Sequence, residues 1–227
     1  MQQLYTQQGE LIEVQKAFMQ KVYTWMVGAL TITGSIAYVI SSKTGLIESI
    51  YPYFTLLVIA QLGVVIFLSA RINKMTSSTA FILFTLYSVL NGVTFSVIFE
   101  VYTASSIAST FFVTAGTFAA MSMYGWFTKK DLTSMGSFLY MALIGLIIAS
   151  VVNMFFASSV MYWVITYAGV LIFVGLTAYD TQKIKKMSVE FHDNESHNKG
   201  AVIGALTLYL DFINLFLYLL RILGNRN

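Results

Sequence analysis

The stretch that decides the fold of this chain is Gly204-Ala-Leu-Thr-Leu-Tyr-Leu-Asp-Phe-Ile-Asn-Leu-Phe-Leu-Tyr-Leu-Leu-Arg-Ile-Leu223. As a helix, it is long and apolar enough to cross a bilayer. Five polar residues recur along it at steps of four, three, four and three, and therefore share one helical face. They are Thr207, Asp211, Asn214, Tyr218 and Arg221. Because lipid penalises an aspartate near the middle of a span, this pattern predicts a central helix wrapped by others.

Two roles are open for this polar face. Thr207, Asn214 and Tyr218 are residue types that join membrane helices through hydrogen bonds, and this packing role is the simpler interpretation for them. Asp211 is different, because a neutral asparagine would join helices equally well at a lower desolvation cost. An ionisable residue inside a span indicates function.

The composition excludes a soluble protein. Of the 227 residues, 57% are hydrophobic and 10% are charged, and the mean hydropathy is +0.74. The chain has no cysteine, which excludes disulfides and thiolate chemistry. The isoelectric point is about 9.0, but the basic residues lie in short clusters between apolar spans, so no nucleic-acid partner is predicted. The partner that the composition does predict is a lipid bilayer.

The chain is predicted to be all-α, with a short cytoplasmic tail over residues 1–20 and a single seven-helix membrane domain over residues 21–227. Each apolar span is close to the length that a bilayer requires. The seven predicted spans are Val22–Ile40, Tyr53–Ala70, Thr79–Val101, Ile107–Phe127, Ser134–Phe156, Val160–Ala178 and Ala201–Leu223.

The basic residues predict which side of the membrane each end occupies. If the N-terminus is cytoplasmic, ten of the thirteen Lys and Arg residues lie in cytoplasmic segments, and only Lys43, Arg221 and Arg226 lie outside. This bias follows the positive-inside rule. The longest connection, residues 181–199, begins with a stretch that can extend the sixth helix. Within it, His192-Asp-Asn-Glu-Ser-His197 has two histidines and two carboxylates, but their spacing matches no familiar metal-ligand pattern, which favours an ordinary polar loop.

The sixth span ends in Gly175-Leu-Thr-Ala-Tyr-Asp180, where Thr177 and Asp180 share a helical face. Two consecutive spans thus each carry an aspartate on a polar stripe. If the stripes face each other, the two carboxyl groups share one proton, because both cannot ionise cheaply side by side. Such a pair can sense pH or attract a hard cation such as calcium. One difficulty is depth, since Asp180 falls near the end of its predicted span while Asp211 lies ten residues inside its own.

Three further charged residues have two interpretations each. Arg71 ends the second span on the same side as Asp180, so the two can form an ion pair, although position alone favours an ordinary positive-inside flank. Glu48 and Glu100 lie at the outer ends of spans. They can gather cations at a pore mouth, but solvated interface positions are the more common case.

Two segments carry a family resemblance: Phe173-Val-Gly-Leu-Thr-Ala-Tyr-Asp-Thr-Gln-Lys-Ile-Lys185 and Ala205-Leu-Thr-Leu-Tyr-Leu-Asp-Phe-Ile-Asn-Leu-Phe216. They resemble the bacterial branch of the Bax inhibitor-1 family, the transmembrane Bax inhibitor motif proteins. The resemblance extends over nearly the whole chain. It implies six helices around a central seventh, an inner-membrane location and a pH-sensitive calcium leak with no cofactor. It further implies that Asp180 and Asp211 form the proton-sharing pair and that Arg71 latches the pair in the closed state.

Two other classes of function stay open. A non-transporting regulator would bind a membrane protease or another inner-membrane complex through the N-terminal tail and the 181–199 connection. An intramembrane aspartyl protease also uses two aspartates that share a proton. Presenilin-like enzymes, however, have Gly-x-Gly-Asp where this chain has Leu208-Tyr-Leu-Asp211, and a proline-containing motif near the last helix is missing. An enzyme is therefore not predicted.

Overall fold

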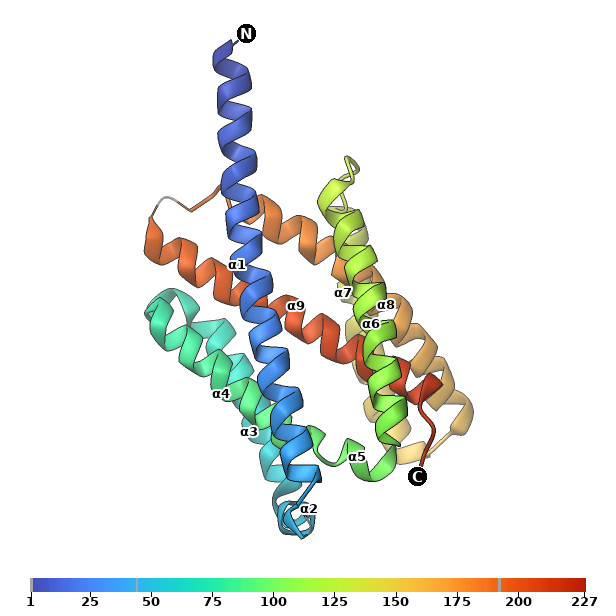
Figure 1. Ribbon diagram of the computed structural model, residues 1–227. Coiled ribbons are helices and arrows are strands. Elements are labelled where there is room, and N and C mark those ends of the chain that lie inside the picture. Colours follow the sequence, from blue (N-terminus) through green and yellow to red (C-terminus); the bar gives the residue numbers. More distant parts are fainter. Residues whose placement is uncertain (1, 44, 192) are drawn as a thin grey trace. The chain divides into compact units, whose positions relative to one another are not determined.

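The computed structural model describes residues 2–43, 45–191 and 193–227, and for residues 2–8 it describes the backbone only. All the elements in this part of the chain are helices (Figure 1). The α-helices are α1 (Gln2–Ser41), α2 (Leu46–Ile50), α3 (Phe54–Arg71), α4 (Ser77–Phe95), α5 (Ile98–Val101), α6 (Ala104–Phe127), α7 (Thr133–Phe156), α8 (Ser159–Met187) and α9 (Asn194–Leu223). Short 3-10 helices, η1 (Tyr51–Tyr53) and η2 (Ile72–Lys74), flank α3.

Seven helical segments are long and apolar enough to cross a membrane, which confirms the predicted number of spans. These segments are Gly9–Ser41, Leu46–Lys74, Ser77–Val101, Ala104–Phe127, Thr133–Phe156, Ser159–Met187 and Asn194–Leu223. The last two are longer than predicted. The α8 helix continues past Ala178 to Met187 because no glycine or proline stops it and because lysines suit the C-terminal end of a helix. Helix α1 is continuous from Gln2 and therefore includes the residues predicted to form a tail.

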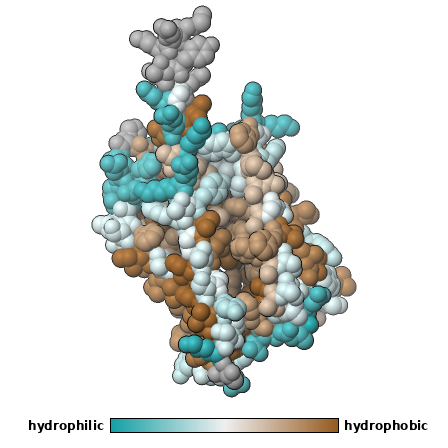
Figure 2. Space-filling view, viewed as in Figure 1, coloured by the Kyte–Doolittle hydropathy of each residue, from teal (hydrophilic) through white to brown (hydrophobic). Residues whose placement is uncertain are grey.

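Large apolar side chains on the helix surfaces indicate contact with lipid. Phe155 at the end of α7 is 82% exposed, and Phe112 on α6 is 73% exposed. On the face shown in Figure 2, hydrophobic residues cover the middle of the helices and hydrophilic residues gather towards helix ends. Helix α9 is the most buried of the seven spans, with 61% of its most apolar stretch inside the protein. The arrangement of six helices around α9 stays a prediction.

The chain divides into two compact units. Unit 1 comprises the residues up to Tyr102, Ile184–Tyr209 and Asn227, and unit 2 comprises Thr103–Lys183 and Leu210–Arg226. The sequence predicts one seven-helix membrane domain and gives no sign of this division.

Unit 1 is built on the packing of α4 against α1 and α3. At its centre the buried hydroxyl of Tyr209, from α9, lies 2.8 Å from the Thr33 hydroxyl, which donates in turn to the Ser88 carbonyl at 2.9 Å. Because the Thr33 hydrogen is used in that bond, the Tyr209 hydroxyl is the donor to Thr33. The Tyr209 ring packs edge-on against Phe84 and Tyr87. These hydrogen bonds and the aromatic rings around them hold α1, α4 and the first half of α9 together.

Unit 2 is built around α8, which packs against α6 and α7. On the α7 side, the core consists of buried aliphatic and aromatic side chains, namely Leu139, Leu146, Ile165, Ile172, Phe173, Leu176 and Leu215. On the α6 side, the contact is between backbones: a Cβ atom at Gly125 would lie 2.2 Å from the Ala178 carbonyl oxygen. Small residues let membrane helices approach this closely. This packing fixes the faces of α8 and α9 that carry the aspartates.

Candidate functional site

Both predicted aspartates lie in unit 2, and the structure brings them together. Asp180 on α8 is 1% exposed and Asp211 on α9 is 4% exposed. Their carboxyl groups are within hydrogen-bonding reach of each other. The structure thus shows two buried carboxyl groups side by side. That they share a proton, as such neighbouring acids tend to do, stays a prediction.

The contact between Asp180 and Asp211 shows that the predicted difference in depth does not keep the two side chains apart. The predicted span ended at Ala178, which placed Asp180 beyond the helix end, whereas α8 continues for seven residues after Asp180. Asp180 therefore lies within a regular helix, and its side chain points into the core of unit 2 rather than into solvent. The predicted extension of the sixth helix beyond its apolar span is confirmed, and the long side chains of Lys183, Lys185 and Lys186 suit a helix that continues towards water.

A tyrosine that the sequence analysis did not single out completes the site. The hydroxyl of Tyr140, on α7, donates to Asp180 at 3.1 Å from Oδ1 and 3.3 Å from Oδ2. The Lys183 ammonium, one turn after Asp180, lies 5.9 Å from the centre of the Tyr140 ring. For Asp211, in contrast, Oδ2 is buried, and no N–H or O–H in the described part of the chain donates to it. The two carboxyl groups therefore have unequal surroundings.

The other polar residues predicted on these faces make packing contacts. Thr177 donates to the Phe173 carbonyl at 2.7 Å, and Asn214 donates to the Leu210 carbonyl at 2.8 Å, so both bonds stay within one helix. The Tyr218 ring stacks on Phe173 with ring centres 6.0 Å apart. Only the Tyr218 contact joins two helices, so hydrogen bonding between helices by Asn214 is not what the structure shows. A functional role for Thr177, Thr207, Asn214 and Tyr218 stays a prediction.

Three predicted residues are exposed and belong to unit 1. Arg71 is the last residue of α3, Glu48 lies in α2 and Glu100 lies in α5. Their predicted roles, as a latch and as acids at an outer mouth, stay predictions.

Much of the segment predicted to be a polar loop, residues 192–197, belongs to helix α9. The α9 helix begins at Asn194, and the Asp193 side chain caps it by accepting the Ser196 backbone N–H at 2.9 Å. Glu195 accepts the backbone N–H and the hydroxyl of Ser77, at 2.6 and 2.7 Å, at the start of α4. These two carboxylates therefore serve as helix caps. His192, one of the two histidines considered as metal ligands in this segment, lies outside the described residues.

Within the described residues, no three His, Asp or Glu side chains gather as metal ligands. Calcium takes six to eight oxygen ligands, and two carboxyl groups alone do not form a closed site for it. The pair suits brief contact with a passing cation better than permanent binding. Calcium binding at Asp180 and Asp211 stays a prediction.

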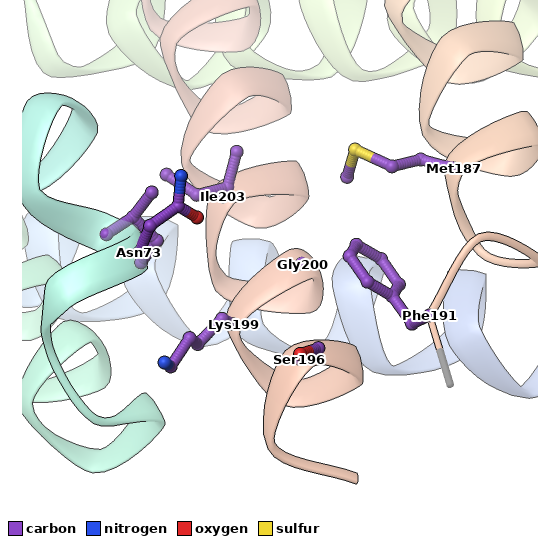
Figure 3. Close-up of a pocket in the computed structure, with 8 residues that line it drawn as sticks. Asn73, Met187, Phe191, Ser196, Lys199, Gly200 and Ile203 are labelled. Carbon is purple, nitrogen blue, oxygen red and sulfur yellow. The ribbon is translucent and has the colours of Figure 1, made fainter. Parts of the chain in front are cut away.

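Unit 1 contains a separate pocket of about 300 Å³ (Figure 3). Its lining includes Ile72, Asn73, Met187, Phe191, Lys199 and Ile203. The Lys199 ammonium already faces Glu195 at 3.8 Å, so little positive charge is left for an anionic ligand. The ring of Phe191 lies against Gly200, where a Cβ atom would come within 2.3 Å of it. The polar side chains of this pocket are Asn73, Ser196 and Lys199, and none of them forms a buried ionisable pair such as Asp180 and Asp211, which are the candidate site.

The fold and the site define an α-helical membrane protein with seven spans that holds a buried pair of aspartates between two of them. Within that class, the chain belongs to the Bax inhibitor-1 family, because the family model described as "Inhibitor of apoptosis-promoting Bax1" matches residues 15–227. The resemblance seen in the two aspartate-bearing segments is thereby confirmed.

Three bacterial relatives are similar along nearly their whole length. The inner membrane protein YbhL of Escherichia coli K12 is 50% identical over 216 residues, which cover 93% of this chain and 92% of the relative. An uncharacterized protein of Borreliella burgdorferi is 49% identical over 225 residues, which cover 97% of each chain. An uncharacterized protein of Deinococcus radiodurans is 38% identical over 227 residues, which cover 100% of this chain and 98% of the relative. With the seven spans, these matches identify an integral membrane protein.

Proposed function

We propose that this protein is a pH-sensitive leak channel for calcium in a bacterial inner membrane, and that the Asp180–Asp211 pair gates it. The observation that carries the proposal is the burial of two carboxyl groups, within hydrogen-bonding reach, between two membrane spans. Ionisable residues are costly at this depth, and membrane proteins keep them chiefly for proton or ion pathways.

The pair can work as a gate because its protonation state controls the contact between α8 and α9. With one shared proton, the two carboxyl groups attract each other through a short hydrogen bond. When both groups lose their protons, two negative charges repel each other in a medium of low dielectric constant, and when both gain one the charge disappears. Either change alters the contact between the two helices, and a change of protonation can thereby open or close a path.

The proposed permeant ion is a cation because the pair carries one negative charge in its singly protonated state. Calcium is the favoured cation, since hard divalent ions prefer carboxylate and carbonyl oxygens. Glu48 and Glu100 are proposed to raise the local cation concentration at the outer ends of the spans. Arg71 is proposed to latch the pair in the closed state, as the family resemblance implies.

Calcium flux in proteoliposomes tests the proposal. Purified full-length protein is reconstituted, and flux is followed with an entrapped calcium indicator over a series of pH values. Asp211→Asn should abolish the pH dependence, because the proton can then no longer leave that position. Ser137→Ala, an exposed change on α7 that removes only a bond to the Thr133 carbonyl, is the matched control. Arg71→Ala should raise the leak at the pH where the wild type is closed.

Two results would overturn the proposal. A purified protein that passes no calcium at any pH is not a channel, and that result would favour the non-transporting regulator. A protein that passes calcium but responds to pH normally after Asp211→Asn is a leak whose gate lies elsewhere. Potassium flux measured in the same vesicles separates a selective calcium path from a general cation path.

A further inference from the structure

We infer that Tyr140 is a positioning residue that places the shared proton on Asp211 and keeps Asp180 as the ionised member of the pair. The inference deepens the proposed function and rests on it only in linking the pair to calcium flux. The location of the proton can be measured without any flux.

The contact between Tyr140 and Asp180 favours negative charge on Asp180. The phenol hydroxyl lies 3.1 Å from one oxygen of this carboxyl group and 3.3 Å from the other, so its hydrogen points between the two. A hydrogen bond to an ionised acceptor is about twice as strong as one to a neutral acceptor. Asp180 is almost fully buried, so water cannot replace this donor.

Packing holds the Tyr140 hydroxyl in place. The Tyr140 ring meets the Tyr179 ring edge-on, with ring centres 6.0 Å apart and an interplanar angle of 83°. Tyr179 in turn lies flat over Gly136, one turn before Tyr140 on α7, where a Cβ atom would come within 2.3 Å of the ring. These ring contacts limit the movement of Tyr140, although the residue is 37% exposed, and so they lower the conformational entropy that is lost in forming the bond.

The surroundings of Asp211 favour the neutral form of its carboxyl group. Its Oδ2 atom is buried, and no donor in the described structure reaches it. An ionised oxygen without a donor is expensive inside a protein, whereas a protonated Asp211 can itself donate to Asp180. Placing the proton on Asp211 therefore gives Asp180 a second donor, and it leaves the unpartnered Oδ2 of Asp211 as a neutral oxygen and not as part of a charged group.

Lys183, the charged side chain beside Tyr140, acts in the same direction. On α8, the Lys183 ammonium lies three residues after Asp180, and its distance to the ring centres of Tyr140 and Tyr179 is 5.9 Å each. Helix α6 has no Asp, Glu, Lys, Arg or His along Ala104–Phe127. On α9, Arg221 is ten residues beyond Asp211 and packs over the rings of Tyr162 and Tyr218. The nearby cation and the nearby hydroxyl donor thus both favour charge on Asp180.

Infrared spectroscopy of the protonated carboxyl groups tests this inference. The full-length protein in lipid nanodiscs is titrated, and the C=O stretch of each carboxylic acid is followed. At neutral pH, Asp211→Asn should remove the carboxylic-acid band, and Asp180→Asn should leave one. The opposite pattern would place the proton on Asp180 and overturn the inference. This assignment does not depend on any tyrosine variant being folded.

The role of the hydroxyl is tested with Tyr140→Phe, which keeps the ring. Without its donor, ionised Asp180 is less stable, so the doubly protonated pair should persist to a pH about one to two units higher. Tyr179→Phe is the matched control, because it removes a neighbouring hydroxyl that is not among the donors to Asp180 in the described structure. Equal midpoints for the two variants would overturn the role of Tyr140.

Flux measured on the same proteins separates the two proposals. A shifted infrared titration in a protein that passes no calcium would support the proton placement and reject the channel. Calcium flux together with an unshifted infrared titration in Tyr140→Phe would support the channel and reject the role of Tyr140 in placing the proton.

Discussion

At the scale of single residues, Gly125 fixes how closely α6 and α8 approach within unit 2. A Cβ atom there would lie 2.2 Å from the Ala178 carbonyl oxygen, and a backbone atom cannot move aside as a side chain can. We expect Gly125→Ala to lower the free energy of unfolding by about 1–3 kcal/mol, as overpacking of a tight contact does. Thermal unfolding in one detergent measures this loss.

The matched control for this prediction is Gly116→Ala on the same helix, where the added methyl group meets nothing within 4 Å. It should leave the unfolding temperature unchanged or slightly raised, because alanine is the better helix former. Equal unfolding temperatures for the two variants would show that α6 and α8 are not in close contact at Gly125.

Single residues also show what sequence reasoning can single out and what it cannot. Asp180 and Asp211 were found because an ionisable residue in an apolar span is conspicuous whatever surrounds it. Tyr140 was not found, because tyrosine is common in membrane helices and its spacing does not show which carboxyl group its hydroxyl reaches. The tyrosine contact depends on how α7 packs against α8, and a periodic pattern along one helix contains no information about that packing.

At the scale of elements, the number of spans followed from hydropathy, but the ends of the last two helices did not. Hydropathy falls where lysines begin in α8 and rises only after the first turns of α9, although both helices are continuous there. Helix ends are set by backbone capping, which depends on local side-chain bonds. The Asp193 cap shows this, because the sequence of its segment predicts an ordinary polar loop and the structure has a capped helix start there.

The Asp193 cap makes the start of α9 sensitive to pH. The Ser196 backbone N–H bonded to this carboxylate lowers the pKa of Asp193 from its ordinary value. A lowered pKa means that the cap stabilises the helix above the ordinary pKa and loses this effect as the pH falls through the lowered value. We therefore expect Asp193→Ala to speed hydrogen exchange at the Ser196 and His197 amides at neutral pH, and to differ little from the wild type in strong acid.

Asp193→Asn is the control for the capping prediction. Asparagine keeps an oxygen acceptor at the cap but cannot ionise. It should preserve most of the protection at neutral pH and remove the pH dependence. Unchanged exchange in Asp193→Ala at neutral pH would mean that the first turn of α9 does not need this side chain.

The connection between α6 and α7 is bonded to Gln182, a side chain of α8. The buried amide of Gln182 accepts the Leu132 backbone N–H at 2.9 Å and donates to the Lys130 carbonyl at 2.8 Å. Gln182→Leu has a similar volume but leaves both backbone groups without this partner, at a cost of about 1–3 kcal/mol each where they stay buried. We expect faster trypsin cleavage after Lys129 and Lys130, measured as the rate of fragment formation in detergent.

Gln182→Glu tests the same connection with one bond retained, because the carboxylate still accepts the Leu132 N–H but cannot donate to the Lys130 carbonyl. Its cleavage rate should fall between those of the wild type and Gln182→Leu. A wild-type rate in Gln182→Leu would show that other contacts fix the connection.

At the scale of the whole molecule, the structure describes two compact units, and the aspartate pair lies entirely within one of them. The side chains of the site come from α7, α8 and the second half of α9, which all belong to unit 2. The division could not be predicted from hydropathy, because every span is apolar in both units and no linker of different composition separates them. Sidedness, in contrast, is a property of the whole chain that the distribution of basic residues does predict.

The predicted sidedness can be tested with single cysteines, since the chain has none of its own and each introduced thiol is unique. The excess of Lys and Arg in the segments assigned to the cytoplasm predicts that the connection after α1 faces outward and that the start of α4 faces inward. Ser49 and Ser78 are exposed residues in these two places. In intact cells, a membrane-impermeant maleimide should label Ser49→Cys and should label Ser78→Cys only after the membrane is permeabilised. The reverse pattern would invert the topology and place the lysines at the end of α8 outside the cell.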